Sequence, residues 1–411
     1  MTVILLAALS LVAPKNDSTV PLLSERQRAY LDMPREERRT LFVDEARRKE
    51  LKNATGDRPL PVRLQWSGAD GKAMVMVSLD GRQVFATNVT ENAVSVWNLE
   101  IARRYEWSVT CGGETAKGSF RTEDRAPRIL YIPGIPNVRD LGGRAGLGGR
   151  RVRQGLVYRT AGLNDNATSK YYRLADIKKF WEEGGEAKVR EELGKCVQVE
   201  GGDLESVIRH LKKGDCSEKS HVNRYFVLPG TMKPGKERLT PATRSYMTDT
   251  LGIRSDIDLR TSVRECYGMT GSPLGSKATW FNYPSSAYGG MQGKSGKAAF
   301  TKVFKVFLDS ANYPIAFHCI AGQDRTGSVA FILNGLLGVA EEELYRDWEV
   351  TAFWNPSVTL NHKDRFDKLV EGFEKNFQGA TLNDKIVAYV LSLGFTMEDI
   401  ERFREIMLES K

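Results

Sequence analysis

One segment of the 411-residue chain constrains its fold more than any other. Residues 314–327 read PIAFHCIAGQDRTG, in which an apolar run typical of a strand ends at His318. A short loop that contains Gly322 follows, and a helical run begins near Thr326. From residue 128 to the C-terminus, other apolar strands are likewise interspersed with helical stretches. The sequence therefore predicts an α/β domain in which Cys319 lies at the end of a strand.

A loop between a strand and a helix N-terminus can aim successive backbone N–H groups at one point, which forms a cradle for an anion. The same field stabilises a thiolate, so we expect Cys319 to have a depressed pKa and to act as a nucleophile. Arg325 offers a planar fork suited to two phosphate oxygens, and Thr326 can donate a hydrogen bond to the sulfur. The loop residues expected to bind the substrate are Ile320, Ala321, Gly322, Gln323, Asp324 and Thr326.

The alternative for this segment is a buried cysteine at an ordinary turn. A Cys followed six residues later by Arg is a weak pattern alone, although the other cysteines have Lys, Gly, Val or Ser at that offset. The whole string favours the anion cradle, because His precedes the Cys and Asp-Arg-Thr-Gly completes the loop.

Composition excludes several classes of protein. With 41% hydrophobic and 27% charged residues, the chain has an ordinary globular composition rather than that of a disordered tail. Its formal charge of +8 is spread thinly and suits anionic substrates, but no basic run or nucleic-acid motif is present, so we expect no nucleic-acid partner. The five cysteines form no CxxC pair and the four histidines are scattered, so neither a metal site nor a cofactor is predicted.

Residues 1–13 (MTVILLAALSLVA) are apolar and give way abruptly to polar sequence. This stretch is too short to span a bilayer and resembles the apolar part of a secretory signal, so we expect residues 1–19 to direct export to the periplasm or the exterior. A buried N-terminal strand or helix in a cytoplasmic protein is the alternative. No other stretch is long enough for a membrane span. In an exported chain, Cys196 and Cys216 could close a disulfide loop, and two buried thiols are the alternative.

Residues 20–58 are rich in Glu and Arg and predict one or two amphipathic helices, broken near Pro34. From residue 59 to residue 125, short alternating strands separated by turns predict a β-sandwich. The order of Trp66, then the Tyr-Glu-Trp at 105–107, then Phe120 resembles a fibronectin type III domain. Such a domain would carry no chemistry and would act as a spacer or dock a partner.

Residues 126–411 are expected to form the α/β domain. Within it, a Lys/Glu-rich stretch at about 164–249 has helical sections such as 174–193, and reads as an insertion or a cap over the sheet. The predicted fold class is therefore multidomain, with an all-β sandwich followed by an α/β domain that carries a helical insertion.

The string His-Cys-x-x-Gly-x-Asp-Arg-Thr-Gly at 318–327 resembles the phosphate loop of the bacterial cysteine-dependent tyrosine phosphatases, including the lipid-active, triple-specificity type. Residues 137–143 (NVRDLGG) with 157–160 (VYRT), and residues 251–260 (LGIRSDIDLR), match two further segments of that family in the right order. Residues 393–400 are similar to its closing helices. The resemblance covers about residues 128–411 apart from the insertion, and implies a metal-free phosphatase domain with a phosphocysteine intermediate.

The Trp-Pro-Asp acid loop of the classical tyrosine phosphatases is absent from the sequence. The resemblance implies that the general acid is Asp258, in the Asp-Leu-Arg segment, and Asp324 inside the loop is the competing candidate. Lipid-active relatives often carry Lys where this chain has Gln323, so a cation that would contact additional phosphates is missing.

His318, Arg139 and Asp140 are expected to support the loop, and a buried ion pair that includes Arg159 is the alternative for the last two. The leading substrate is a phosphotyrosine-type monoester in a protein or small ester, and an inositol phosphate or phosphoinositide is second. A catalytically silent exported protein that binds phosphorylated ligands is a rival from another class. A thiol redox enzyme is a third reading, although no resolving cysteine lies near Cys319 in the sequence.

Overall fold

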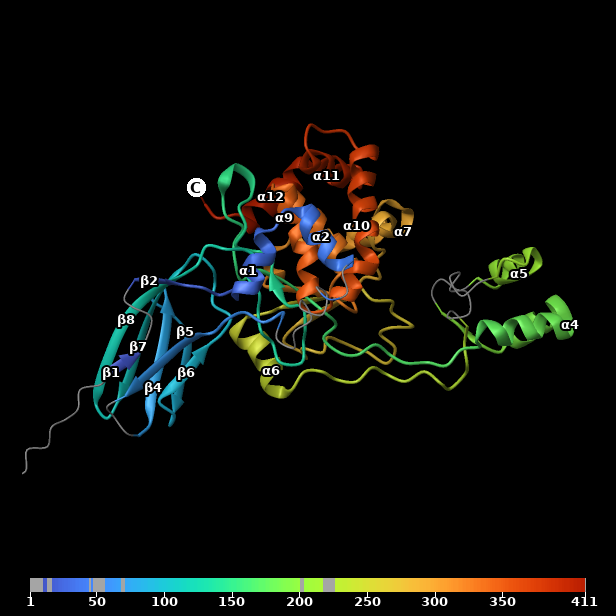
Figure 1. Ribbon diagram of the computed structural model, residues 1–411. Helices are drawn as coiled ribbons and strands as arrows, with labels where there is room; N and C mark the ends of the chain where they lie inside the picture. The colour runs from blue at the N-terminus through green and yellow to red at the C-terminus, as the bar shows by residue number, and fades with distance from the viewer. Residues whose placement is uncertain are drawn as a thin grey trace, which may run out of the picture.

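The computed structural model describes residues 10–12, 17–43, 46, 56–67, 71–199, 203–216 and 226–410. Figure 1 shows a group of strands on one side, a body of helices beside it, and an arm that carries two helices away from that body. The molecule is mixed α/β, with sheets in separate parts, in agreement with the predicted multidomain fold class. The residue boundaries assigned to the domains from the sequence stay a prediction.

The first part consists of two sheets with a common core. One sheet has the strand order β1-β3-β6 and the other has the order β2-β8-β7-β4-β5. Inward-facing side chains from both sheets, among them Trp66, Val75 and Val109, form one apolar cluster. The likeness to a fibronectin type III domain stays a prediction. The strands are β1 (Ser10–Val12), β2 (Ser18–Val20), β3 (Val62–Ser67), β4 (Ala73–Leu79), β5 (Arg82–Val89), β6 (Ala93–Val96), β7 (Arg104–Cys111) and β8 (Glu114–Thr122).

Strand β5 was not predicted from the sequence. It pairs along its length with β4 at the edge of the larger sheet. None of its residues is fully buried, so it needs no apolar face and its sequence lacks the clear alternation of its neighbours. Sequence patterning reports burial, and an exposed edge strand leaves little of that pattern.

The second sheet has the order β14-β13-β15-β10-β9, and it is parallel apart from the antiparallel edge strand β9. Ile315 and Phe317 of the central strand β15 belong to the large apolar cluster formed with the C-terminal helices, while Ala316 belongs to a second cluster on the other face. The sheet is thus covered on both faces, as parallel sheets usually are. Its strands are β9 (Arg139–Asp140), β10 (Val157–Thr160), β13 (Ser255–Asp258), β14 (Thr279–Asn282) and β15 (Ile315–His318).

The helices of the body follow the strands and close around the first of these clusters. Trp348 stacks on Phe366 with ring centroids 4.9 Å apart, which joins α9 to α10. The helices are α6 (Pro241–Ser245), α7 (Lys294–Phe307), α8 (Asp324–Leu336), α9 (Glu341–Glu349), α10 (Pro356–Asn376), α11 (Leu382–Leu391) and α12 (Met397–Met407), with short helical turns η5 (Tyr288–Gln292) and η7 (Val350–Phe353).

Two N-terminal helices, α1 (Glu25–Asp32) and α2 (Arg35–Val43), confirm the predicted helical stretch and its break near Pro34. They lie against the C-terminal helices in Figure 1, next to α9 and α10. Tyr30 packs edge-on against Phe353 at 5.1 Å, and Arg38 Nε donates to Glu349 at 2.6 Å. The N-terminal helices therefore belong to the α/β body.

The predicted insertion forms an arm. Three antiparallel bridges, Asn164 with Glu237, Thr168 with Lys233 and Tyr171 with Val227, hold its outgoing and returning chains together. At its end, α4 (Leu174–Gly194) and α5 (Leu204–Lys213) pack on a small core of their own, with β11 (Val197–Gln198) and β12 (Phe226–Val227). Figure 1 shows both helices far from the body, so the module does not cap the sheet. Cys196 and Cys216 are free thiols in this small core.

Most of the export signal predicted at residues 1–19 lies outside the described residues, namely positions 1–9 and 13–16. Between them, Ser10–Val12 pair with β3. Export stays a prediction. Among the helices in the described ranges, none combines the length and the apolar character needed to cross a bilayer.

Candidate active site

Cys319 lies at the carboxyl end of the central strand β15, which pairs with β10 on one side and β13 on the other. The loop after it turns directly into α8, as the sequence predicted. Gly322 makes this turn with a φ of +69°, and a Cβ at that position would lie 2.4 Å from the Thr160 carbonyl oxygen. Only glycine fits there without displacing the neighbouring strand.

The loop carbonyls after Cys319 are held from outside the loop. The bonds run from Gly162 N–H to Ile320 O (3.0 Å), from Asn137 Nδ2 to Ala321 O (2.8 Å) and from Arg159 Nη2 to Gly322 O (2.6 Å). In the described part of the chain, the backbone N–H groups of these same three residues have no acceptor. A peptide group whose carbonyl is fixed on one side presents its N–H on the other, so the loop has the donors that an anion requires.

A buried cluster behind the loop fixes these outside donors. The Asp347 carboxylate on α9 accepts from Arg159 and lies 3.0 Å from Arg144 and 3.4 Å from Arg139. Arg139 in turn donates to Asn137. Burial acts to raise the pKa of Asp347, but the arginines outweigh it and the pKa is lowered.

The structure places the residues of the predicted support in two separate groups. Arg159 forms a buried ion pair and also orients the loop by its bond to Gly322 O. Asp140 is separate from this cluster. It accepts from Arg128 at 2.8 Å and from Gly142 N–H at 2.7 Å, so it supports the turn at Gly142 and does not reach the loop after Cys319.

The Cys319 thiol is almost completely buried, with 1% of the residue exposed. Burial acts to raise the pKa of this thiol, but the positive charge of Arg325 and hydrogen bonds from the Thr326 hydroxyl and backbone N–H outweigh it, so the pKa is lowered. The buried Thr326 hydroxyl has no oxygen or nitrogen partner among the described residues. These features favour a thiolate at Cys319.

Arg325 is the second residue of α8, and the Glu265 carboxylate binds its guanidinium group. Its Nη1 donates to Glu265 Oε2 at 2.7 Å and its Nη2 to Oε1 at 3.3 Å, while Nη1 also lies 3.3 Å from the Leu259 carbonyl oxygen. A bidentate carboxylate fixes the plane of the fork.

Asp258, the acid implied by the family resemblance, lies at the end of β13 and has no exposed surface. Its carboxylate accepts from Arg260 at 2.7 and 2.9 Å, and His318 Nδ1 lies 3.8 Å away. Burial acts to raise the pKa of Asp258, but His318 and Arg260 lower it to about 2. This geometry does not favour Asp258 as a proton donor. It makes Asp258, with Asp256 at 3.0 Å from His318 Nε2, part of the support beneath Cys319.

Asp324 has a different setting. Its Oδ1 accepts from the Tyr288 hydroxyl and lies 2.7 Å from His362 Nδ1 on α10. Its side chain is 28% exposed, against none for Asp258. Burial acts to raise the pKa of Asp324, while His362 and Tyr288 lower it below its ordinary value.

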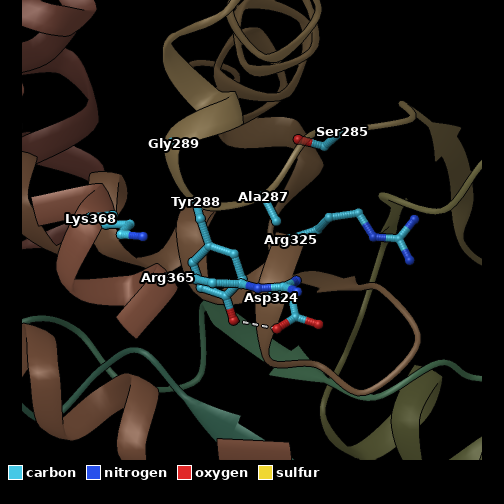
Figure 2. Close-up of a pocket in the computed structure, with 8 residues that line it drawn as sticks. All are labelled: Ser285, Ala287, Tyr288, Gly289, Asp324, Arg325, Arg365 and Lys368. Atoms are coloured by element: carbon cyan, nitrogen blue, oxygen red, sulfur yellow. Dashed lines mark hydrogen bonds between the residues drawn. The ribbon is translucent and has the colours of Figure 1, made fainter. Parts of the chain in front are cut away.

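A pocket of about 470 Å³ opens beside the loop. Figure 2 shows Asp324 and Tyr288 joined at its centre, with Arg325 on one side and Lys368 on the other. The residues that line it are Ser285, Ala287, Tyr288, Gly289, Asp324, Arg325, Arg365 and Lys368. In the described ranges, no group of three or more His, Cys, Asp or Glu side chains could hold a metal ion.

The structure adds residues that the sequence did not single out for this site: Glu265, Tyr288, His362, Arg365 and Lys368. Two of them had a weak signal. Glu265 follows the Asp-Leu-Arg segment closely, and Tyr288 lies in the Tyr/Ser/Gly-rich stretch at 283–290, for which the sequence leaves a pocket rim and a plain loop open. No sequence signal pointed to His362, Arg365 and Lys368 of α10, because ordinary surface helices carry the same residue types.

Fold and site together define a protein whose central parallel strand ends at a buried cysteine, followed by a short loop and an arginine at the start of the next helix. Comparison with known families agrees: residues 130–179 and 235–409 match the model of the tyrosine phosphatase family. The chain therefore belongs to the tyrosine phosphatase family, which confirms that part of the predicted resemblance. The unmatched residues between these segments include most of the arm.

Two curated relatives show the same likeness. The chain is 27% identical over 224 residues to a protein of Cupriavidus necator that carries the name of a tyrosine-protein phosphatase, a match that covers 53% of this chain and 61% of that protein. It is 28% identical over 150 residues to a tyrosine-protein phosphatase of Nostoc commune, covering 32% of this chain and 50% of the relative. The chain thus spans less than two thirds of the length of either relative.

Proposed function

We propose that this chain is a phosphomonoester hydrolase that acts through a phosphocysteine on Cys319, with phosphotyrosine in proteins as its leading substrate. The observation that carries the proposal is the loop itself, in which the N–H groups of residues 320–322 have no acceptor among the described residues while their carbonyls are fixed. The equatorial oxygens of a phosphoryl group would accept these N–H bonds together with the fork of Arg325.

The reaction has two steps. The Cys319 thiolate attacks phosphorus in line, the S–P bond forms, and the bond from phosphorus to the leaving oxygen breaks as that oxygen takes a proton from a general acid. The carboxylate left by the general acid then takes a proton from water as the water oxygen attacks phosphorus. The new O–P bond forms, the S–P bond breaks, and inorganic phosphate leaves as the thiolate is restored. The Thr326 hydroxyl stabilises the sulfur in both its attacking and leaving roles.

We assign the general acid to Asp324 rather than to Asp258. Asp324 lines the pocket, whereas Asp258 is fully buried and paired with Arg260. The pKa of Asp324 is low in the free protein, but a bound phosphate dianion raises the pKa of a neighbouring carboxyl. His362 and Tyr288 then hold the carboxyl in one orientation as positioning residues.

Leaving-group dependence tests this assignment. Asp324→Asn is expected to lower turnover of phenyl phosphate by about 10²-fold or more, and turnover of 4-nitrophenyl phosphate far less, because nitrophenolate leaves without a proton. The fall of kcat at high pH in the wild type should disappear in Asp324→Asn, because kcat reports the pKa of the acid in the enzyme–substrate complex. If Asp258→Asn shows this leaving-group dependence and Asp324→Asn does not, Asp258 is the acid.

The depth of the nucleophile supports phosphotyrosine over shorter esters. Only 1% of Cys319 is exposed, so a phosphoryl group must reach it at the end of a long side chain. An aryl ester provides that length, and a serine ester on a peptide does not.

The primary experiment is hydrolysis, with EDTA present, of a phosphotyrosine peptide, a phosphoserine peptide and a phosphoinositide panel. Cys319→Ser should abolish turnover and keep binding of the ester, while Cys111→Ser, which alters another buried thiol in the strand part, should keep full turnover. Wild-type-like turnover by Cys319→Ser would disprove the covalent mechanism. A preference for inositol esters would favour the second substrate class, and binding without any turnover would favour a catalytically silent protein.

A further inference from the structure

Helix α10 places two cations in the wall of the pocket. Arg365 and Lys368 are one helical turn apart, so they lie on the same face of α10, and both line the cavity that contains Arg325. Figure 2 shows them reaching in from the side opposite the Arg325 guanidinium. Both residues are exposed, and in the described part of the chain neither forms an ion pair within 4.0 Å.

The acids next to them on the helix are bound elsewhere. Asp364 pairs with Lys363 at 2.9 Å, and Asp367 accepts from Arg39 Nη1 of α2 at 2.8 Å. The N-terminal helix thus neutralises the carboxylate that stands between the two cations in the sequence. The positive charge of Arg365 and Lys368 is left to the pocket.

The charges that line the pocket do not balance. Arg325 is paired with Glu265, and the single lining carboxylate, Asp324, accepts from Tyr288. Arg365 and Lys368 line the same pocket with no ion pair among the described residues. Arg325 is needed for the phosphoryl group. Gln323, the loop position where a further cation could act, is neutral and fully buried. Positive charge beyond that needed for one phosphate therefore lies on α10, at the wall of the pocket.

We propose that Arg365 and Lys368 form a second anion subsite that binds an acidic side chain beside the phosphotyrosine of a peptide substrate. This inference rests on the proposed function and names its preferred substrates. A tyrosine ester that reaches the buried Cys319 leaves its peptide neighbours outside the loop, where exposed Arg and Lys side chains can contact carboxylates. A neutral residue at position 323 leaves the loop itself without the extra cation that a polyphosphorylated headgroup would use.

Two phosphotyrosine peptides that differ only in their flanking residues test the subsite, one with Asp and Glu and one with Asn and Gln. The wild-type protein should favour the acidic peptide in kcat/KM. The double variant Arg365→Ala/Lys368→Ala should reduce that preference about fivefold, as expected for two solvent-exposed ion pairs, and Arg365→Glu/Lys368→Glu should reverse it. Added salt should weaken the wild-type preference.

Lys375→Ala is the matched control, because Lys375 is an exposed cation of the same helix that does not line the pocket. It should keep the wild-type preference. An equal preference in the wild type and in Arg365→Ala/Lys368→Ala would overturn the subsite.

Failure of the subsite and failure of the proposed function give different results. Affinities of both peptides for the Cys319→Ser protein measure the subsite without turnover, and hydrolysis of 4-nitrophenyl phosphate measures the chemistry without the subsite. Preserved hydrolysis with equal peptide affinities overturns the subsite alone. A wild-type protein that binds both peptides but hydrolyses no ester overturns the proposed function. If Arg365→Ala/Lys368→Ala loses only turnover of a phosphatidylinositol bisphosphate in phosphatidylcholine vesicles, the assignment of the subsite to peptides is wrong.

Discussion

The Glu265 carboxylate accepts from both terminal nitrogens of Arg325, at 2.7 and 3.3 Å. This pair is largely buried, with 15% of the Arg325 side chain and 8% of the Glu265 side chain exposed. A charge-assisted bidentate pair of this kind fixes a guanidinium in one plane, ready for the oxygens of a ligand. Glu265 is therefore a positioning residue that acts through Arg325.

Substitution of this residue should change binding and turnover together. Glu265→Gln keeps the shape but loses the second charged acceptor, so we expect the KM for 4-nitrophenyl phosphate to rise and kcat to fall, with kcat/KM about tenfold lower. The affinity for inorganic phosphate should fall in parallel, which a change in stability alone would not cause. Glu398→Gln on the exposed start of α12 is the control. Unchanged phosphate affinity in Glu265→Gln would contradict this role.

The ionised Asp347 carboxylate makes the stability of the protein depend on pH. Its pKa in the folded protein lies below the value of about 3.9 for an unfolded aspartate, because the surrounding arginines outweigh the effect of burial. Its contribution to stability is therefore complete above about pH 4 and is lost as pH falls through the lower folded-state pKa.

Asp347→Asn should lower the free energy of unfolding at pH 7 by about 3 kcal/mol, because the buried Arg139 and Arg159 lose the carboxylate they pair with. The stability difference between wild type and variant should shrink as the pH is lowered toward 2. Denaturant unfolding at several pH values measures both. A difference that stays constant with pH would show that the ionised carboxylate is not what stabilises the cluster.

Residues close together in sequence were the ones that could be predicted. Cys319, Gly322 and Arg325 belong to one strand-loop-helix segment, whose pattern of apolar and special residues is local. Glu265 and His362 lie 60 and 38 positions from their loop partners, so only the folded chain brings them there. The choice between Asp258 and Asp324 depended on burial and ion pairing, and the sequence left it open.

At the scale of elements, ion pairs from α2 bind the N-terminal helices to the helices of the body. The Arg38 side chain has no exposed surface and donates to Glu349 at 2.6 Å, to Glu342 at 2.7 Å and to the Met33 carbonyl at 2.6 Å. Arg39 next to it holds Asp367 of α10. Because α10 also supplies His362, Arg365 and Lys368, the N-terminal helices hold the helix that forms one wall of the pocket.

Arg38→Leu should destabilise the protein by about 3 kcal/mol, because the buried Glu349 would lose its hydrogen-bonded partner and keep only Arg39, 3.8 Å away. The double variant Arg38→Leu/Glu349→Leu should recover most of this loss, since it removes both buried charges. Thermal unfolding of the two variants measures the difference. Equal losses in the single and double variants would show that shape, rather than charge, is what the pair provides.

Helices and strands with a buried apolar face could be predicted from the sequence. An exposed edge strand, and the packing of helices through ion pairs between distant segments, could not. The break near Pro34, the strand before Cys319 and the long helix at 174–194 follow from proline geometry and apolar periodicity. Strand β5 is an exposed edge and was missed. The placement of α1 and α2 against α9 and α10 depends on ion pairs between distant segments, which composition does not reveal.

At the scale of the whole molecule, the arm is a separate unit. The apolar cluster between α4 and α5 is built from arm residues alone. The arm begins and ends side by side, because the Leu228 N–H donates to the Lys170 carbonyl at 2.9 Å. The family model matches on either side of most of this unit, at 130–179 and 235–409, so it is an addition to the common fold.

Removal of the arm should leave the catalytic body intact. Replacing residues 171–227 with an Asn-Gly turn joins two backbone positions that are already hydrogen-bonded as neighbours. We expect kcat/KM for 4-nitrophenyl phosphate to stay within about twofold and the midpoint of thermal unfolding to change little, because the apolar cluster of the arm includes, among the described residues, none from the body. A tenfold loss of activity would show that the arm shapes the site.

The arm also affects the order in which the molecule can assemble during synthesis. Strand β10 ends at Thr160, and its parallel partner β15 begins only at Ile315. At a usual rate of about 5–20 residues per second, β10 leaves the ribosome roughly 8 to 30 s before β15 exists. The arm emerges in that interval, and its apolar cluster is formed by arm residues alone. These residues can therefore be buried before the strand that leads to Cys319 has been synthesised.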